Sequence, residues 1–250
     1  MADEDPVFET TTGPVRVITA ASLFDGHDAA INVMRRLIQA SGAEVIHLGH
    51  DQSAQAVVDC AVQEDAHAIA LTSYQGGHVE YFTYIRQLLD EAGCEHVRIF
   101  GGGGGTITPP EIRTLHQSGI TKIYSPDDGR SMGLMGMIHH LMSLAAEVDL
   151  IDETRLASLD GPVTVDDMAK VGMLMTLSES ADDATFKAAI ETARSSNKNV
   201  PVIVFTGTGG AGKSSRLDEL MLRIPRDNPG YTVSLLCVHH TLIETGAPFL

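Results

Sequence analysis

Short segments rich in β-branched residues alternate with helical segments from residue 15 to residue 148. The expected strands are 15–20, 43–49, 68–74, 97–102 and 121–125, and the expected helices are 29–40, 53–64, 78–92, 109–117 and 131–148. Strands that alternate with helices of this length form right-handed βαβ units around a parallel sheet. We therefore predict an α/β fold with a flavodoxin-like, doubly wound, five-stranded parallel sheet. Such sheets bind ligands at the carboxyl ends of their strands.

The sequence changes character after the fifth helix. Residues 149–198 are polar, with helical spacing and no strand signal, so we expect a helical linker. A second α/β unit then begins, with expected strands at 200–205 and 231–238 around the helix 214–224. About 50 residues are too few to close a sheet and cover both faces, so we expect this unit to be incomplete and cut off. The predicted domains are 14–148, 149–198 and 199–250.

Composition narrows the class of protein. Apolar residues make up 43% of the 250, enough for a core, and the net charge is −16. A negative surface repels phosphate backbones, which argues against nucleic acid as a partner. The three cysteines form no C-x-x-C pair, and the acidic N-terminus lacks the apolar stretch of a signal peptide. No apolar run reaches the roughly 18 residues of a membrane span. We expect a cytoplasmic protein that binds no membrane.

Polar or glycine-rich turns follow three of the expected strands. Asp25, His27 and Asp28 follow the first strand, "SYQGG" at 73–77 follows the third, and "GGGGG" at 101–105 follows the fourth. The carboxyl ends of parallel strands meet at one edge of the sheet. Glycine at a strand end lets the backbone approach a ligand closely. These turns therefore predict a deep slot, next to one imidazole, for a large flat ligand.

The sequence "DGHDAA", residues 25–30, resembles the D-x-H-x-x-G signature of base-off, His-on cobalamin-binding domains. "SYQ" and the later "GG" match the partner motifs S-x-L and G-G in position, although Ala30 replaces a glycine and Gln75 a leucine. The resemblance covers residues 14–148. It implies that His27 ligates the cobalt of adenosylcobalamin in place of the cofactor's dimethylbenzimidazole. The implied cofactor-binding residues are Ser22, Asp25, Gly26, His27, Asp28, Ser73, Gln75, Gly76, Gly77, Gly101, Gly102 and Gly103.

The chemistry of these residues agrees with that role. A metal-bound imidazole needs an acceptor for its other nitrogen, and Asp25 is close enough in sequence to supply one. Gly26 is expected to permit the bend. Ser73 is expected to hydrogen-bond the buried base, and the glycines from 101 to 103 to leave room for the nucleotide tail. A turn histidine taken alone is usually a surface residue, so the three motifs together carry the prediction.

A second motif lies at 207–214, where "GTGGAGKS" fits G-x-x-x-x-G-K-[ST] between an expected strand and helix. In such a P-loop the backbone N–H groups cradle phosphates at a helix N-terminus. Lys213 would contact the β- and γ-phosphates, and Ser214 would hold Mg²⁺. The expected nucleotide-binding residues are Gly207, Gly209, Gly210, Ala211, Gly212, Lys213, Ser214 and Ser215.

The order of cobalamin-type domain, helical linker and P-loop resembles the fused isobutyryl-CoA mutase family. That resemblance implies an adenosylcobalamin-dependent isomerase with a GTP-binding chaperone domain. It also implies an acyl-CoA-binding barrel, on the same chain or on a separate subunit, and leaves a homodimer open. The sequence departs from the family at His239, which stands where the family has an aspartate that helps organise Mg²⁺. The guanine-binding N-K-x-D element is also missing from these 250 residues.

Three functions remain open at this stage. In the first, the chain is the cofactor module of a radical acyl-CoA mutase, and no residue of its own is expected in substrate chemistry. Alternatively, it is a P-loop nucleotide switch whose flavodoxin-like domain has lost its cofactor, which Ala30 and Gln75 would favour. A third interpretation is a carrier or regulatory protein that delivers cobalamin to a separate subunit.

Overall fold

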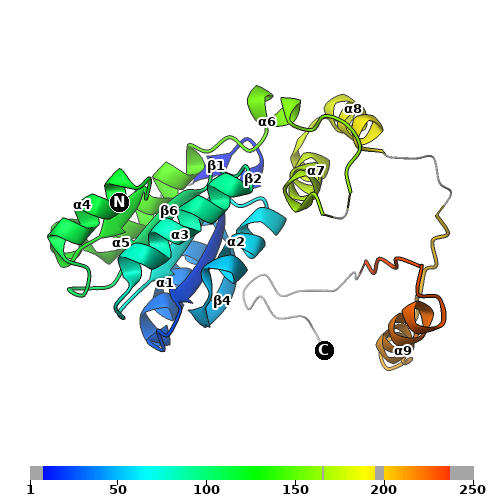
Figure 1. The fold of residues 1–250 in the computed structure, drawn as a ribbon, viewed down its shortest axis with the longest axis horizontal. Helices are drawn as coiled ribbons and strands as arrows, with labels where there is room; N and C mark the ends of the chain where they lie inside the picture. Colours follow the sequence, from blue (N-terminus) through cyan, green and yellow to red (C-terminus); the bar gives the residue numbers. More distant parts are fainter. Residues whose placement is uncertain (1–7, 165, 195–199, 237–250) are drawn as a thin grey trace, which may run out of the picture. The chain divides into compact units, whose positions relative to one another are not determined.

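The computed structural model describes residues 8–164, 166–194 and 200–236 (Figure 1). The chain divides into two compact units, Met1–Asn197 and Lys198–Leu250. Within the described residues, no helix is both long enough and apolar enough to cross a bilayer. The first unit contains a parallel sheet with helices packed on both of its faces.

The sheet confirms the predicted flavodoxin-like order. Its strands run in the order β4-β3-β5-β6-β7, and all neighbouring pairs are parallel. Their bounds are β3 Arg16–Ser22, β4 Glu44–Gln52, β5 Ala68–Thr72, β6 Arg98–Gly102 and β7 Lys122–Tyr124. A short antiparallel pair, β1 Glu9–Thr10 and β2 Gly13–Pro14, precedes the sheet. Strands of two residues carry no periodic signal, so the sequence did not predict this pair.

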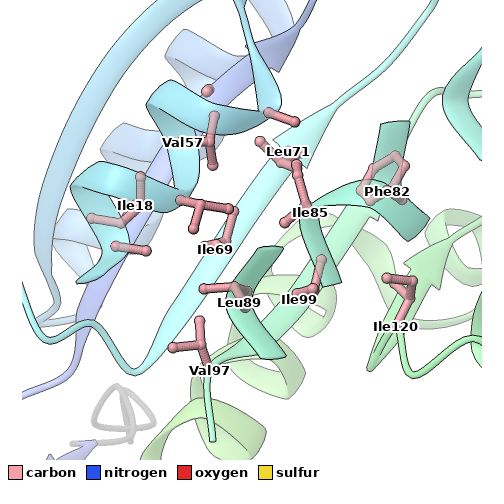
Figure 2. Packing of buried hydrophobic residues seen from close by; sticks show 14 of the residues in the cluster. Ile18, Val57, Ile69, Leu71, Phe82, Ile85, Leu89, Val97, Ile99 and Ile120 are labelled. Atoms are coloured by element: carbon pink, nitrogen blue, oxygen red, sulfur yellow. The ribbon is translucent and has the colours of Figure 1, made fainter. Parts of the chain in front are cut away.

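Five helices cover the two faces of the sheet: α1 Asp28–Ala40, α2 Ala54–Gln63, α3 His78–Glu91, α4 Pro109–Gln117 and α5 Pro126–Ala146. The helices α2, α3 and α4 pack on one face. Figure 2 shows part of this packing, where Ile69 and Ile99 of the sheet meet Val57 of α2 and Leu89 of α3. The helices α1 and α5 pack on the opposite face, around Phe100. Burial of these apolar side chains stabilises the doubly wound layers.

The helix α5 begins at Pro126 rather than at the predicted residue 131. Ser125 and Asp128 form a reciprocal capping box there, and proline occupies the first helical position. Gly133 has non-helical angles, φ 70° and ψ 175°, and interrupts the helix. The methionine-rich pattern after this kink marked only the second part of the helix.

The polar segment after α5 contains three helices, α6 Glu153–Ala157, α7 Met168–Ser180 and α8 Asp183–Ala193. The helix α7 lies directly against α2, because a Cβ atom at Gly172 would be only 2.8 Å from the carbonyl oxygen of Val62. These helices belong to the same compact unit as the sheet.

The described part of the second unit contains one helix, α9 Lys213–Asp227. The predicted strand at 200–205 is wrong, and so is the described part, 231–236, of the strand predicted at 231–238. Residues 200–205 are exposed, and no neighbouring strand among the described residues satisfies their backbone groups. An isolated apolar segment does not form a strand without such a neighbour. His239 lies outside the described residues.

Candidate functional site

The turn between β3 and α1 joins a buried carboxylate to an exposed imidazole. Asp25 is fully buried, whereas the side chain of His27 is 63% exposed. The Nδ1 of His27 lies 2.7 Å from Oδ1 of Asp25, and the His27 backbone N–H donates to the same oxygen at 2.9 Å. The sequence thus correctly paired these two residues. The ring nitrogen Nε2 remains at the solvent side of the pair.

Three hydrogen bonds keep Asp25 ionised. Burial raises the pKa of this carboxyl, but the bonds from the Tyr74 N–H, the His27 N–H and the His27 imidazole lower it below its ordinary value. The Tyr74 bond is the shortest, 2.6 Å to Oδ2. An ionised carboxylate can only accept, so Nδ1 of His27 carries a proton, and in the neutral imidazole the lone pair is then on Nε2. This tautomer is the one that binds a metal.

Phe24, rather than Gly26, adopts the left-handed backbone in this turn. Its φ is +63°, and its N–H donates to Oδ1 of Asp51 at 2.7 Å. Gly26 has no left-handed φ, and a Cβ atom there would meet nothing within 4 Å. The expectation that Gly26 permits the bend is therefore wrong. A side-chain bond from the neighbouring strand β4 stabilises the bend instead.

A cavity of about 250 Å³ lies beside the pair, between the sheet and the helices α1 and α5. Its walls are mainly apolar, and Gly101, Gly102 and Gly103 at the end of β6 line it. Further lining residues include Ile31, Met34 and Ile38 of α1; Thr72 and Tyr74 at the end of β5; Tyr124 and Ser125 at the end of β7; and Met137, Ile138 and Leu141 of α5. The cavity is a partly open, mainly apolar space that a flat, largely apolar group could enter.

Comparison with known proteins identifies this arrangement. The B12 binding domain family matches residues 15–127. The fused isobutyryl-CoA mutase of Geobacillus kaustophilus (strain HTA426) is 47% identical over 243 residues, 94% of this chain and 22% of that protein. The corresponding mutase of Cupriavidus metallidurans is 48% identical, over 94% of this chain and 21% of that protein.

A third relative, the 2-hydroxyisobutanoyl-CoA mutase small subunit of Aquincola tertiaricarbonis, is 33% identical over 115 residues, 46% of this chain and 82% of that subunit. The chain belongs to the B12-binding-domain family of acyl-CoA mutases. It spans about a fifth of the length of the two fused mutases that it matches.

The three predicted glycines at the end of β6 in this B12-binding domain have different neighbours. A Cβ atom on Gly101 would lie 2.5 Å from the ring of Phe82, on the face covered by α3. A Cβ atom on Gly103 would lie 1.9 Å from the carbonyl oxygen of Ser73. A Cβ atom on Gly102 would only touch the Tyr124 carbonyl oxygen, at 3.5 Å. Gly102 is thus the glycine whose substitution the protein itself tolerates while the cavity shrinks.

The remaining predicted cofactor residues of the B12-binding domain are not among those that line the cavity. Ser22 and Ser73 are buried, and the Ser22 hydroxyl donates to Ser73 Oγ at 2.9 Å. Asp28 is the exposed first residue of α1. The other three, which are exposed and precede α3, are Gln75, Gly76 and the left-handed N-cap Gly77.

Sequence reasoning missed three groups in the B12-binding domain. The Tyr74 N–H and the Asp51 carboxylate stabilise the His27 turn from other strands. Thr72 lines the cavity, and its hydroxyl has no hydrogen-bond partner among the described residues. Period-two alternation along β5 could have found Thr72, because Ala68 and Ala70 mark the same face.

The P-loop predicted at 207–214 lies in the second unit. Its helix α9 begins at Lys213, and the helix N-cap Gly212 and nearby Gly210 have left-handed φ angles. Nζ of Lys213 donates to the carbonyl oxygens of Gly207 and Thr208 at 2.7 and 2.8 Å. The other predicted nucleotide residues lie in this exposed loop and the first turn of the helix: Gly209, Ala211, Ser214 and Ser215.

Proposed function

We propose that this chain binds adenosylcobalamin as the cofactor module of a radical acyl-CoA mutase. His27 would hold the cobalt through Nε2, in the base-off, His-on mode. The observation that carries the proposal is the hydrogen bond between Nδ1 of His27 and the buried, ionised Asp25. One imidazole suffices as a protein ligand because the corrin ring supplies the other nitrogens around the metal.

The cavity beside this pair fits the rest of the cofactor. A base displaced from cobalt is flat and aromatic, and it remains attached through a flexible nucleotide tail. An apolar cavity of about 250 Å³, bordered by the glycine backbone at the end of β6, accommodates such a ring. Gly102 leaves this space free at the sheet surface. The residues present therefore fit the cofactor that the family name implies.

The chain's own residues bind and orient in this proposal. When bound, adenosylcobalamin supplies the cobalt–carbon homolysis that starts the radical rearrangement. Asp25 holds the proton on Nδ1 of His27, which fixes the ring orientation and makes Nε2 a stronger ligand. Substrate chemistry belongs to an acyl-CoA-binding barrel, on the same polypeptide or a partner subunit. A cytoplasmic location and a homodimer are further parts of the proposal.

The absorbance spectrum of the purified chain with cobalamin tests the cobalt ligand. We expect a base-off, His-on spectrum with the wild-type chain and its loss in His27→Ala. Asp59→Ala, which removes an exposed carboxylate on α2, is the control and should retain the spectrum. Absence of binding at near-millimolar cobalamin would overturn the proposal.

A pair of glycine variants tests the cavity. Gly102→Ala adds a methyl group to the cavity wall without a close contact, so cobalamin affinity should fall while the melting temperature hardly changes. Gly101→Ala forces the new methyl group into Phe82. It should lower the free energy of unfolding by about 1–3 kcal/mol, and the melting temperature with it. Equal effects of the two variants on stability would contradict the assigned faces.

We also propose that the loop 207–215 binds GTP with Mg²⁺. Lys213 lies at the start of α9 and is held by two loop carbonyl oxygens. These carbonyl bonds would exchange for β- and γ-phosphate oxygens when the nucleotide binds, and Ser214 would hold the metal. Calorimetry with GTP and Mg²⁺ should give binding that Lys213→Ala removes and that Lys187→Ala, on α8, leaves unchanged. Nucleotide binding without any cobalamin binding would favour the switch function over the mutase module.

A further inference from the structure

The helix α5 contains one residue in a conformation that only glycine adopts readily. Gly133 has φ 70° and ψ 175°, inside a helix that runs from Pro126 to Ala146. A Cβ atom at Gly133 would meet nothing within 4 Å, so packing does not require a glycine there. The backbone alone requires it, because other residues reach these angles only at a cost in energy. Outliers of this kind are common where a helix bends or moves.

The two parts of α5 are held to the sheet separately. Before the kink, Nζ of Lys122 on β7 lies 2.9 Å from Oδ1 of Asp128. After the kink, Ile138 and Leu141 are buried in the core beside the sheet. Between these two anchors, every residue from 130 to 135 is exposed. The bend therefore lies in a stretch that the core does not hold in place.

Both parts of α5 line the same cavity. Pro126 and Gly129 come from the part before the kink, and Met137 and Ile138 from the part after it. With the kink in place the cavity is partly open. The backbone angles at Gly133 therefore set how far apart these two walls of the cavity stand.

Three large apolar side chains next to the kink are exposed. Met132 and Leu134 are each 39% exposed, and Met135 is 40% exposed. A movement of α5 that covered part of this surface against a mainly apolar ligand would be favourable. The kinked conformation forgoes that burial, which gives the helix a reason to change shape when the cavity is filled.

Resting on the proposed cobalamin function, we propose that residues 126–132 form a lid that is hinged at Gly133. The kinked conformation is the open one, and it admits the displaced base and the nucleotide tail to the cavity. In the closed conformation α5 is a more continuous helix, and the lid covers the ligand. Hinges are a few residues that absorb a large change in φ and ψ. The lid therefore controls how fast the cofactor enters and leaves.

The rates of cobalamin binding to the full chain test the hinge. Gly133→Ala disfavours the left-handed φ of the open form and favours the helical angles of the closed form. We expect the association and dissociation rate constants both to fall about 3- to 10-fold, while the equilibrium affinity does not decrease. Stopped-flow absorbance at the His-on band measures association, and displacement by excess cobalamin measures dissociation.

Gly161→Ala is the matched control. Gly161 also has φ +70°, and a Cβ atom there would meet nothing within 4 Å, but the residue lies in the segment after α6 and does not line the cavity. This variant should leave both rate constants unchanged. Unchanged rate constants in Gly133→Ala would overturn the lid, and so would a weaker affinity at an unchanged association rate.

Hydrogen exchange of the wild-type chain tests the lid without any substitution. Saturating cobalamin should slow exchange of the amides at 130–135 about fivefold or more, and leave those of α4, on the opposite face of the sheet, unchanged. Equal exchange at 130–135 with and without cobalamin would overturn the lid. If the lid fails while the His27 spectrum forms, the proposed function stands. If the wild-type chain binds no cobalamin, both fail.

Discussion

The two ends of the parallel sheet carry polar groups that are buried in different ways. At the carboxyl end, buried Asp25 holds an exposed imidazole, and the Thr72 hydroxyl has no hydrogen-bond partner within the ranges that the structure describes. At the amino end lies a basal network of Arg16, Asp65 and His67 with two residues of the later helices, Arg155 and Thr176.

Each of the five residues of the basal network has a hydrogen-bond partner within the described part of the chain. Nε2 of the adjacent His96, 3.9 Å from Oδ1 of Asp65, has none. Asp65 accepts from Arg155 at 2.5 Å and from Thr176 at 2.8 Å. The Arg16 guanidinium donates to Thr176, and the Arg16 N–H donates to Nδ1 of His67 at 3.0 Å. Because α6 and α7 supply two of these partners, the network joins the polar segment after α5 to the sheet. Its function is structural.

The difference between the two ends distinguishes binding from stability. Polar groups that are buried and fully paired within the protein hold elements together. A buried anion whose partner is exposed, beside a cavity, is the arrangement that the proposed cofactor function requires. Changes at the amino end should therefore alter stability, and changes at the carboxyl end should alter cofactor binding.

The largest expected effect is on stability, in Asp65→Ala. Removing this carboxylate leaves the nearly buried Arg155 without its anion and should lower the free energy of unfolding by about 3–5 kcal/mol. Urea unfolding followed by circular dichroism measures it, since the chain has no tryptophan. Asp59→Ala, on the exposed face of α2, is the control and should change stability by less than about 0.5 kcal/mol. A loss below about 1 kcal/mol for Asp65→Ala would contradict a structural network.

The second largest expected effect is a loss of stability in acid, through His67 at the amino end of the sheet. Burial, with the charge of Arg16, lowers the pKa of His67 to about 4, whereas an unfolded histidine titrates near 6.5. Between these values the unfolded chain binds the extra proton, so stability falls as pH drops from about 6.5 to 4. The loss is on the order of 3 kcal/mol and ends below about pH 4.

Urea unfolding at several pH values measures this slope. His67→Asn keeps an acceptor for the Arg16 N–H but cannot titrate, so its stability should fall less steeply with acid. The same slope is compared in His116→Asn, which removes a less buried imidazole. The pKa of His116 is lowered by burial and by Lys122. Identical slopes for wild type and His67→Asn would exclude His67 as the source.

At the carboxyl end, Asp25→Asn should weaken cobalamin binding about 10- to 100-fold, the usual effect of losing the partner of a metal-bound histidine. An asparagine can donate to Nδ1 and so shift the proton to Nε2, the nitrogen needed for cobalt. Absorbance titration with cobalamin measures the affinity. Asp59→Asn removes an exposed charge on α2 and should change the affinity less than about twofold. Unchanged affinity in Asp25→Asn would show that the Asp25–His27 pair does not contribute to cobalamin binding.

The smallest expected effect is the stability change in His27→Ala without cofactor. The ring is 63% exposed, and Asp25 keeps its two backbone donors. The free energy of unfolding should therefore change by less than about 1 kcal/mol. Thermal melting of the cofactor-free chain measures it. A loss comparable to that of Asp65→Ala would remove the distinction between the two ends.

Features set by residues close together in the sequence were predictable, and features set by distant residues were not. Strand and helix order was predictable because apolar periodicity is local, and the Asp25–His27 pair because the two residues are two positions apart. The strand predicted at 200–205 was wrong because a strand needs neighbours, which periodicity cannot supply. The basal network was not predicted because its partners are up to 160 residues apart in the chain.

By itself, the sequence determined the α/β order of the first unit, the turn that carries His27 and the glycine run that follows β6. Tertiary structure alone decided that Gly101 faces Phe82 while Gly102 faces the cavity, that Tyr74 donates to Asp25, and that Thr72 stands between Ala21 and Gly102. Local composition specifies which element forms. The pairing register of distant strands specifies which side chains meet, and hence which polar group remains for a ligand.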